Sequence, residues 1–246
     1  MSTWNHEPSK QTHILAGGQG HSVAHCVRVG DSGSWDCLED AIFDTGAGDV
    51  LVLRIRASGE AWALVRNFAD ETTLYARDVT TPGSAWVPQE NPVCSPGESI
   101  CNDGGLVALA LDEDEQAVFV ASESASLMRR DMDGEWEDIS PQFGGADPAG
   151  SGVELRAVSE YDGTLVVAGY ERQCLFSASG EGCVLEHGRW WLFMGAVGEG
   201  GAVAWSQGVM LLEESCGQGL PRSCPAANEP SGPLSVNVLS EGGSSS

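Results

Sequence analysis

The sequence predicts an all-β protein. Its 246 residues include 32 glycines and 11 prolines, well above ordinary usage, which favours strands joined by turns. The apolar residues come in short runs bounded by turns, and a hydrophobic content of 41% is enough for a packed core. Tryptophan also recurs regularly: Trp35, Trp86, Trp136 and Trp190 lie about 50 residues apart, and each follows a glycine turn.

The first unit of this repeat begins with an apolar strand at residues 13–17. Cys26 and Cys37 follow, symmetric about the turn at 31–33, so we expect them to face each other across a hairpin. No strand precedes 13–17 in this unit, whereas residues 234–239 alternate as a strand should and have no unit of their own. We therefore expect residues 234–239 to pair with the strand at 13–17.

The next three units share four short strands in one order, and the last strand of each begins at Trp86, Trp136 or Trp190. Their first three strands are expected at 50–55, 61–65 and 74–76, at 106–111, 117–121 and 127–129, and at 154–158, 165–169 and 173–176. Turns at 58–60, 112–115 and 161–163 separate first from second strands. A fifth unit is expected at 195–197, 202–206 and 209–212, with its last strand reduced around 222–224.

Units of four strands and about 50 residues resemble the blades of β-propellers. The resemblance is to five-bladed propellers of the bacterial exported type; it spans the chain and concerns the fold alone. It implies a single domain at residues 1–239, with its ring closed by the C-terminal strand, and a flexible linker or tail at 240–246. A β-sandwich is the alternative, because its turns recur at similar intervals.

The formal net charge is −24, from 36 acidic and 12 basic residues spread along the chain. Nearly every exposed face therefore carries negative potential, which excludes nucleic acid and anionic membranes as favoured partners. No apolar run approaches the roughly 18 residues of a membrane span, so we expect no membrane insertion. We expect a monomer whose ligand, a glycan or a protein, is neutral or cationic.

Eight cysteines fall into four pairs of near neighbours, a pattern typical of disulfide-bonded exported proteins. The expected bonds are Cys26–Cys37, Cys94–Cys101, Cys174–Cys183 and Cys216–Cys224. Zinc is not expected, because these spacings lack the close cysteine pairs of tetrahedral sites. We infer an extracellular, periplasmic or cell-surface location, with a signal peptide already removed.

The acidic turns of the sequence contain no complete metal-binding or catalytic motif. Residues 31–35 and 133–136 are similar to the Asp box of sialidase-like propellers, a turn element without a catalytic role. The segments 131–135 and 112–115 carry oxygens that suit Ca²⁺, but neither completes an EF-hand spacing, so we expect no cofactor.

Catalysis is not indicated by any known motif: the sequence has no G-x-S-x-G, H-E-x-x-H, Walker or dinucleotide-binding glycine pattern. We therefore expect a non-catalytic binding module. The alternative is a propeller-type glycoside hydrolase or lyase using paired carboxylates, for which Glu154 and Asp49, near the starts of first strands, are positions to inspect.

Ligand binding is expected at the rim of the propeller, on the loops between second and third strands and on the loops between blades. The loops between second and third strands carry His21, Phe68, Tyr170, Arg172 and Gln207. An aromatic ring beside polar groups suits sugar or peptide recognition, because the ring stacks and the polar groups fix orientation. The alternative is that Phe68 and Tyr170 only cap the cores of their blades.

Overall fold

The computed structural model describes residues 2–217, apart from 7–10, 19–21, 31–32, 42–47, 68, 70, 82, 93–104, 113–116, 124, 132–133, 142–152 and 177–182. Its regular elements are the strands β1 to β17 and one short 3₁₀ helix, Glu199–Gly201. The expected all-β class is therefore confirmed.

The strands form four antiparallel sheets, each built from strands that follow one another in the chain. Sheet A contains β1 (Ser2–His6), β2 (Gln11–Gly17), β3 (Ser22–Val29) and β4 (Trp35–Ala41). Sheet B contains β5 (Gly48–Ile55), β6 (Glu60–Asn67), β7 (Thr72–Asp78) and β8 (Val87–Pro88). Sheet C contains β9 (Leu106–Leu111), β10 (Val118–Ser122), β11 (Leu127–Arg130) and β12 (Trp136–Asp138). Sheet D contains β13 (Val153–Tyr161), β14 (Thr164–Phe176), β15 (Cys183–Val197), β16 (Val203–Trp205) and β17 (Val209–Gly217).

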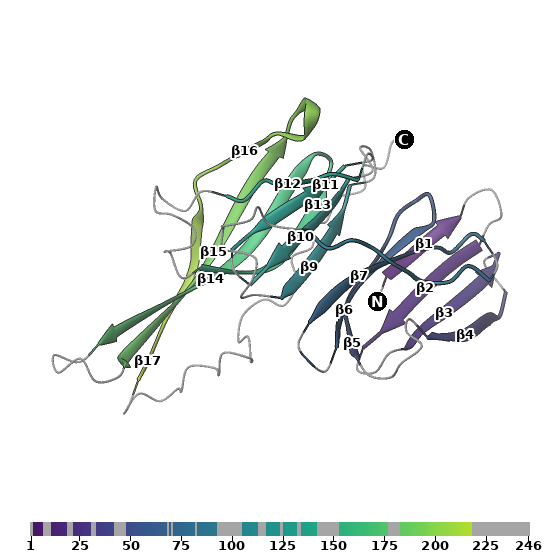
Figure 1. The fold of residues 1–246 in the computed structure, drawn as a ribbon, viewed down its shortest axis with the longest axis horizontal. Helices are drawn as coiled ribbons and strands as arrows, with labels where there is room; N and C mark the ends of the chain where they lie inside the picture. The colour runs from purple at the N-terminus through teal and green to yellow at the C-terminus, as the bar shows by residue number, and fades with distance from the viewer. Residues whose placement is uncertain are drawn as a thin grey trace, which may run out of the picture.

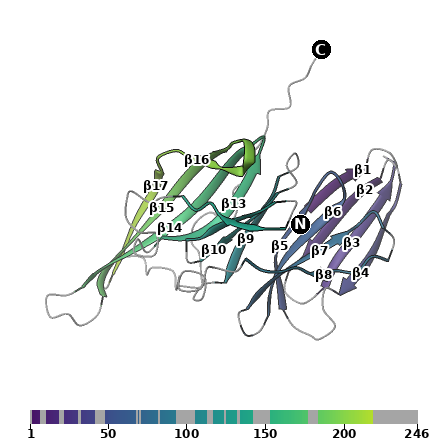
Figure 2. The same ribbon diagram turned by 45° about the horizontal axis from the view of Figure 1, so that its top comes forward.

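Sheets A to D follow one another in space in the order of the chain (Figure 1). Their first strands are neighbours: β1 lies beside β5, β5 beside β9, and β9 beside β13. The turned view shows the same order, with the long strands of sheet D at the end opposite sheet A (Figure 2). The carboxyl ends of β5, β9 and β13 are thereby brought close together.

Sheet B buries both of its faces, and this explains the continuous apolar run in β6. Successive residues of a strand point to opposite faces. Ala61, Ala63 and Val65 accordingly join a core shared with sheet A, whereas Trp62 and Leu64 join a core shared with sheet C. A strand covered on both sides needs apolar residues at every position rather than at alternate ones.

Sheet C repeats this arrangement in β10. Val118 and Val120 face the core shared with sheet B, while Phe119 and Ala121 face the core shared with sheet D. Three cores between four sheets thus hold the described chain together, each formed by interdigitating side chains from two successive sheets.

The edge of sheet A differs from the expectation. The pairing of residues 234–239 with the strand at 13–17 is wrong, because β1 occupies that edge, with Ser2 opposite Leu15 and His6 opposite Gln11. A strand from the immediately preceding segment closes a far shorter loop than one from the other end of the chain, so its entropic cost is lower. Residues 234–239, and the tail expected at 240–246, lie outside the described residues.

The strands expected for a fifth unit are part of sheet D. Residues 195–197 are the end of β15, and both β16 and β17 pair with β15 rather than with each other. Gly195 allows this close pairing, because a Cβ there would lie only 2.8 Å from the Trp205 ring. The separate fifth unit is therefore wrong for these strands; the blade number and the closure of a ring stay predictions.

Candidate functional site

The expected rim residues are dispersed in the structure. Gln207 is exposed in the link between β16 and β17, whereas His21 and Phe68 lie outside the described residues. Tyr170 and Arg172 do not lie on a loop, because β14 runs unbroken through both positions as it pairs with β15. The loop expected between second and third strands of this unit is therefore wrong.

Tyr170 is part of the interior of sheet D. Its side chain is 6% exposed, and its ring lies 5.0 Å from that of Trp190, which is opposite it on β15. The phenol group lies over Gly188, where any side chain would clash with it. This burial agrees with the alternative in which Tyr170 caps a core, and a ligand-binding role for Tyr170 stays a prediction.

One expected disulfide bond is confirmed. Cys26 on β3 is directly opposite Cys37 on β4, and the two are bonded. The bond fits an extracellular location. It also confirms the hairpin that the sequence predicts between these cysteines.

The other expected pairs stay predictions. Cys94, Cys101 and Cys224 lie outside the described residues. Cys174 lies on β14 and Cys183 on β15, and a register shift in this hairpin sets Cys174 opposite Glu186 and Cys183 opposite Phe176.

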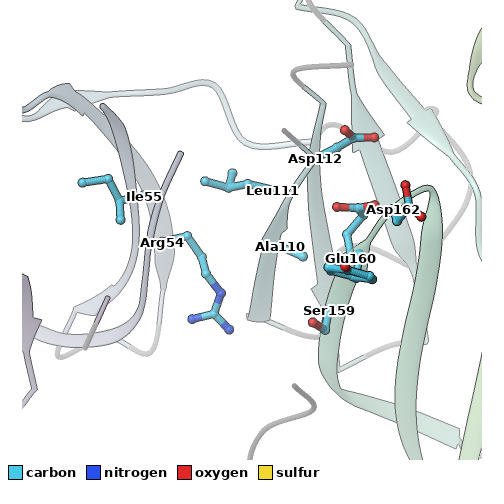
Figure 3. Close-up of a pocket in the computed structure, with 9 residues that line it drawn as sticks. Arg54, Ile55, Ala110, Leu111, Asp112, Ser159, Glu160 and Asp162 are labelled. Atoms are coloured by element: carbon cyan, nitrogen blue, oxygen red, sulfur yellow. The ribbon is translucent and has the colours of Figure 1, made fainter. Parts of the chain in front are cut away.

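A pocket of about 470 Å³ lies where β5, β9 and β13 end (Figure 3). Its size falls within the roughly 300–1,000 Å³ typical of small-ligand sites. It is lined by three short segments, which are residues 54–55, 110–112 and 159–162. Each segment lies at the carboxyl end of the first strand of its sheet. The pocket therefore forms because the first strands pack side by side.

The charged groups of this pocket stand on two walls. Arg54 projects from β5 on one side, and the carboxylates of Asp112, Glu160 and Asp162 lie on the other (Figure 3). Ala110 and Leu111 on β9 lie between the two walls (Figure 3). The described lining of the pocket therefore combines one cation, the apolar residues Ala110 and Leu111, and three carboxylates.

Arg54 is half-buried, and its Nη1 donates a hydrogen bond to the carbonyl of Leu53 at 2.9 Å. Within the described part of the chain it forms no ion pair with a carboxylate. Burial lowers the pKa of its guanidinium, since desolvation disfavours the charged form. A guanidinium nevertheless stays protonated at neutral pH.

The β13–β14 turn positions two of the carboxylates. Asp162 and Gly163 both have positive φ, 49° and 72°, as the two-residue Asp-Gly hairpin turn requires. The Gly163 amide donates to Glu160 Oε1 at 2.8 Å, which holds this carboxylate against the turn. Asp162 itself is exposed, as is Tyr161 between them, at 44%.

Asp112 is the buried carboxylate of the pocket, with only 4% of its surface exposed. Its amide donates to the carbonyl of Ala117 at 3.0 Å, which closes the β9–β10 connection. The turns at 112–115 and 161–163 are both recognised in the sequence, but only as turns. That both turns line one pocket together with Arg54 was not predicted from the sequence.

The recurrence of charged residues at the end of each first strand is the signal that would have located this pocket. In antiparallel sheets the loops between second and third strands lie at the opposite end from the turns between first and second strands. Glu154 and Asp49 also lie at that opposite end, near the starts of β13 and β5. Neither carboxylate lines the pocket, and Glu154 forms an ion pair with Arg156.

No metal-binding group of three or more histidine, cysteine or acidic side chains occurs among the described residues. In the segment 131–135, Asp131 instead closes a turn, accepting at Oδ1 from the Glu135 amide at 3.3 Å. His13 Nδ1 and His25 Nε2 lie 3.0 Å apart, a hydrogen-bond distance. In the part of the chain that the structure covers, no helix has the length and apolar character needed to cross a membrane.

Comparison with known proteins gives low structural similarity. No family model and no curated sequence matches the chain. Among solved structures, a proposed 6-phosphogluconolactonase from Bacteroides uniformis has a TM-score of 0.42 at 12% identity, over 84% of this chain and 70% of that one. The β-propeller domain of Cps50 (Swd1) from Myceliophteria thermophila has a TM-score of 0.40 at 11% identity, over 87% of this chain and 79% of that one. The Malassezia sympodialis allergen Mala s 1 has a TM-score of 0.35 at 10% identity, over 80% and 75%.

Proposed function

We propose that this protein is a non-catalytic binding module, exported or displayed on the cell surface, that binds a cationic group of a glycan or protein ligand. The observation that carries the proposal is the excess of carboxylates in the pocket: among its described lining residues, Asp112, Glu160 and Asp162 are acidic and Arg54 alone is cationic. The net charge of −24 adds attraction for cations at longer range.

The architecture we propose is propeller-like. It is supported by antiparallel sheets that follow the chain, share cores face to face and keep their first strands adjacent. In such folds the sheets are arranged radially about a central channel. A pocket formed by the ends of first strands suits the mouth of that channel. Closure of these sheets into a ring is the finer form of this proposal.

The location we propose, outside the cytoplasm, is supported by the Cys26–Cys37 bond. Extracellular ligands with exposed amines include deacetylated glycans and lysine-rich segments of proteins. Both would meet the carboxylate wall of the pocket with an ammonium group.

The test is calorimetric titration with matched pairs of probes. Chitosan oligomers are compared with their N-acetylated counterparts, and oligolysine with oligoglycine, at low and high salt. The cationic member of each pair should bind, and its affinity should fall with salt because the charges are partly exposed. Asp162→Asn should weaken binding about fivefold, the equivalent of roughly 1 kcal/mol for a partly exposed pair.

The variant is conservative, since asparagine also tolerates the positive φ at position 162. Glu137→Gln, an exposed change on β12 outside the pocket, is the matched control and should leave the affinity unaltered. Equal binding of neutral and cationic probes, or an Asp162→Asn variant that binds like the unmodified protein, would contradict the proposal.

A glycoside hydrolase is the second candidate, and the observation that favours it is the presence of three carboxylates in one pocket. Release of reducing sugar from a polysaccharide, abolished by Asp112→Asn or Glu160→Gln, would replace the binding proposal with this one. If no polysaccharide is cleaved, the non-catalytic assignment stands.

A further inference from the structure

We propose that the Cys26–Cys37 bond is a redox switch: a small thiol reduces it in the folded protein, and β4 then separates from β3. The bond joins β4, the last strand of sheet A, to the strand beside it. None of the described residues that line the pocket belongs to sheet A, so this proposal is independent of the proposed function.

The first argument is that β4 has no described side chain in a core. Its described side chains, at residues 35–39, are all exposed, with Leu38 at 67%. Leu15 and Val23, the described sheet A residues in the core shared with sheet B, lie on β2 and β3 instead. Burial of apolar surface is the main favourable term in folding. β4 can therefore separate while that core stays intact.

The second argument concerns the other described contacts between β4 and β3. The ladder between the two strands runs from Arg28 opposite Trp35 to Ser22 opposite Ala41. The Arg28 guanidinium also lies 5.0 Å from the centre of the Trp35 ring, a cation–π contact that is weak at an exposed site. A two-stranded hairpin held by such contacts alone is only marginally stable in water. The covalent bond therefore decides whether β4 stays paired.

The third argument is that a thiol can reach the bond without unfolding the protein. Successive residues of a strand point to opposite faces, so Cys26 lies on the face of sheet A opposite to that of Val23, which packs towards sheet B. Sheet A ends the row of described sheets, and none of the others covers this far face (Figure 1). Cys37 itself is exposed on the edge strand.

The reaction is thiol–disulfide exchange, with a small thiol as the reductant. Its thiolate attacks the sulfur of Cys37, which is exposed whereas Cys26 is half-buried, and Cys26 leaves as a thiolate. A second molecule of thiol then attacks the mixed disulfide on Cys37 and releases this cysteine. The reductant becomes its own disulfide, and its two thiol protons end on the two cysteines.

Reduction changes the edge of sheet A. In the oxidised chain β3 is paired along both of its edges, with β2 and with β4. Once β4 separates, the backbone groups of β3 that bonded to it form an open sheet edge. The cores between the sheets keep their side chains, so the oxidised and reduced chains differ in the pairing of one strand.

The first experiment follows reduction of the full, oxidised chain by 2-mercaptoethanol. Free thiols are trapped with iodoacetamide, and peptide mass mapping measures the labelling of Cys26 and Cys37. The rate should be proportional to the thiol concentration and constant across urea concentrations below the unfolding transition. A rate that rises from zero urea with the slope of global unfolding would show that the bond reacts only in the unfolded chain, and would overturn the proposal.

The second experiment measures amide hydrogen exchange in the oxidised chain and in the double variant Cys26→Ser, Cys37→Ser, which lacks the bond without a reductant. The amides that join β4 to β3 should exchange about a hundredfold faster in the variant, because closing a loop of this size restricts the separated strands by about that factor. In the variant they should also exchange far faster than the amides of β6 and β10, which are protected by the cores.

Two results of this experiment would overturn the proposal. Unchanged exchange of β4 would mean that the ladder alone holds the strand. Exchange of β4 that is no faster than that of β6 and β10 in the variant would mean that β4 opens only when the whole chain unfolds. If the variant does not fold, the unmodified chain reduced by the thiol gives the same comparison.

Leu38→Ala is the matched control, because it alters an exposed side chain of β4 and leaves the bond in place. In the oxidised chain its β4 amides should exchange within about threefold of the unmodified rate. Reoxidation of the reduced, unmodified chain with glutathione disulfide tests reversibility, and it should return β4 to its original exchange rate. Exchange that stays fast after mass mapping detects the re-formed Cys26–Cys37 bond would count against the switch and overturn it.

Discussion

Replacing Arg56 with methionine should loosen the contact between sheets B and C. Arg56 directly follows β5 and is 4% exposed. Its Nη2 donates to the carbonyl of Ala117 at 2.6 Å, next to β10 on sheet C, and its Nη1 donates to Glu60 Oε2 at 2.5 Å within sheet B. Methionine keeps the apolar stem and removes these hydrogen bonds.

The magnitude follows from the burial of each bond. The buried contact with Ala117 should contribute about 1.5–3 kcal/mol, since the donor is charged. The pair with Glu60, whose side chain is 39% exposed, contributes about 0.5–1 kcal/mol after screening. Ala117 keeps a second donor, the Asp112 amide at 3.0 Å, so its carbonyl is not left unsatisfied. The expected loss is about 2–4 kcal/mol, or a fall in Tm of roughly 4–16 °C for a chain of this size.

The assay is urea unfolding followed by tryptophan fluorescence, with an unchanged m-value required for comparison. Glu60→Gln is the control, because it removes only the exposed charge and should cost less than about 1 kcal/mol. An Arg56→Met variant as stable as Glu60→Gln would refute the argument that Arg56 joins the two sheets.

Three further predictions concern stability. The double variant Cys26→Ser, Cys37→Ser should lose about 3 kcal/mol of unfolding free energy, because the bond spans 11 residues and restricts the unfolded chain. Its Tm, measured without reductant, should fall by roughly 6–12 °C, and an unchanged Tm would contradict the prediction. Gly188→Ala should lower the free energy of unfolding by about 1–3 kcal/mol, because the new Cβ displaces the Tyr170 ring. Gly18→Ala should be close to neutral in the same melt, because no described atom lies within 4 Å of a Cβ at that position. Hydrogen bonds from neighbouring threonine hydroxyls lower the pKa of Asp78, so its contribution to stability is present above its unfolded pKa of about 4 and is lost as the pH falls through the lower folded value. Asp78→Asn should therefore flatten the stability profile below about pH 4, and acid titrations that match those of the unmodified protein would count against this.

The strands of sheets B and C were predictable because each buried strand is a run of consecutive apolar residues. The run at 61–65 is apolar throughout, and it becomes β6 with alternate residues in two different cores. The same holds for 117–121 and β10. A pattern of this kind depends only on local spacing and on cover from both sides, so it does not require knowledge of distant contacts.

Sheet D and β1 were harder to predict for a physical reason. Residues 170–173 are mostly polar, which indicates a loop, yet β14 continues through them because β15 supplies a complete ladder of partners. Residues 2–6 have no apolar run, and they form β1 because the edge of β2 is adjacent in the chain. In both segments the pairing partner decides the conformation more than the residues' own preferences do.

The candidate site was not predicted from the sequence because its residues lie at the ends of strands, outside the repeated apolar runs. Positions inside β6 and β10 face a neighbouring sheet and are committed to the cores, so their chemistry is restricted to apolar groups. The ends of first strands are free of that restriction, and there the chain places Arg54, Asp112 and Asp162. These residues come from three sheets, and their meeting depends on how β5, β9 and β13 pack, which no local spacing reports. The repeat pattern therefore identifies strands, while the pocket that we propose as the ligand site is lined by the few residues where the pattern stops. Exchanging these few side chains should alter the ligand while leaving the three cores, and hence the fold, in place.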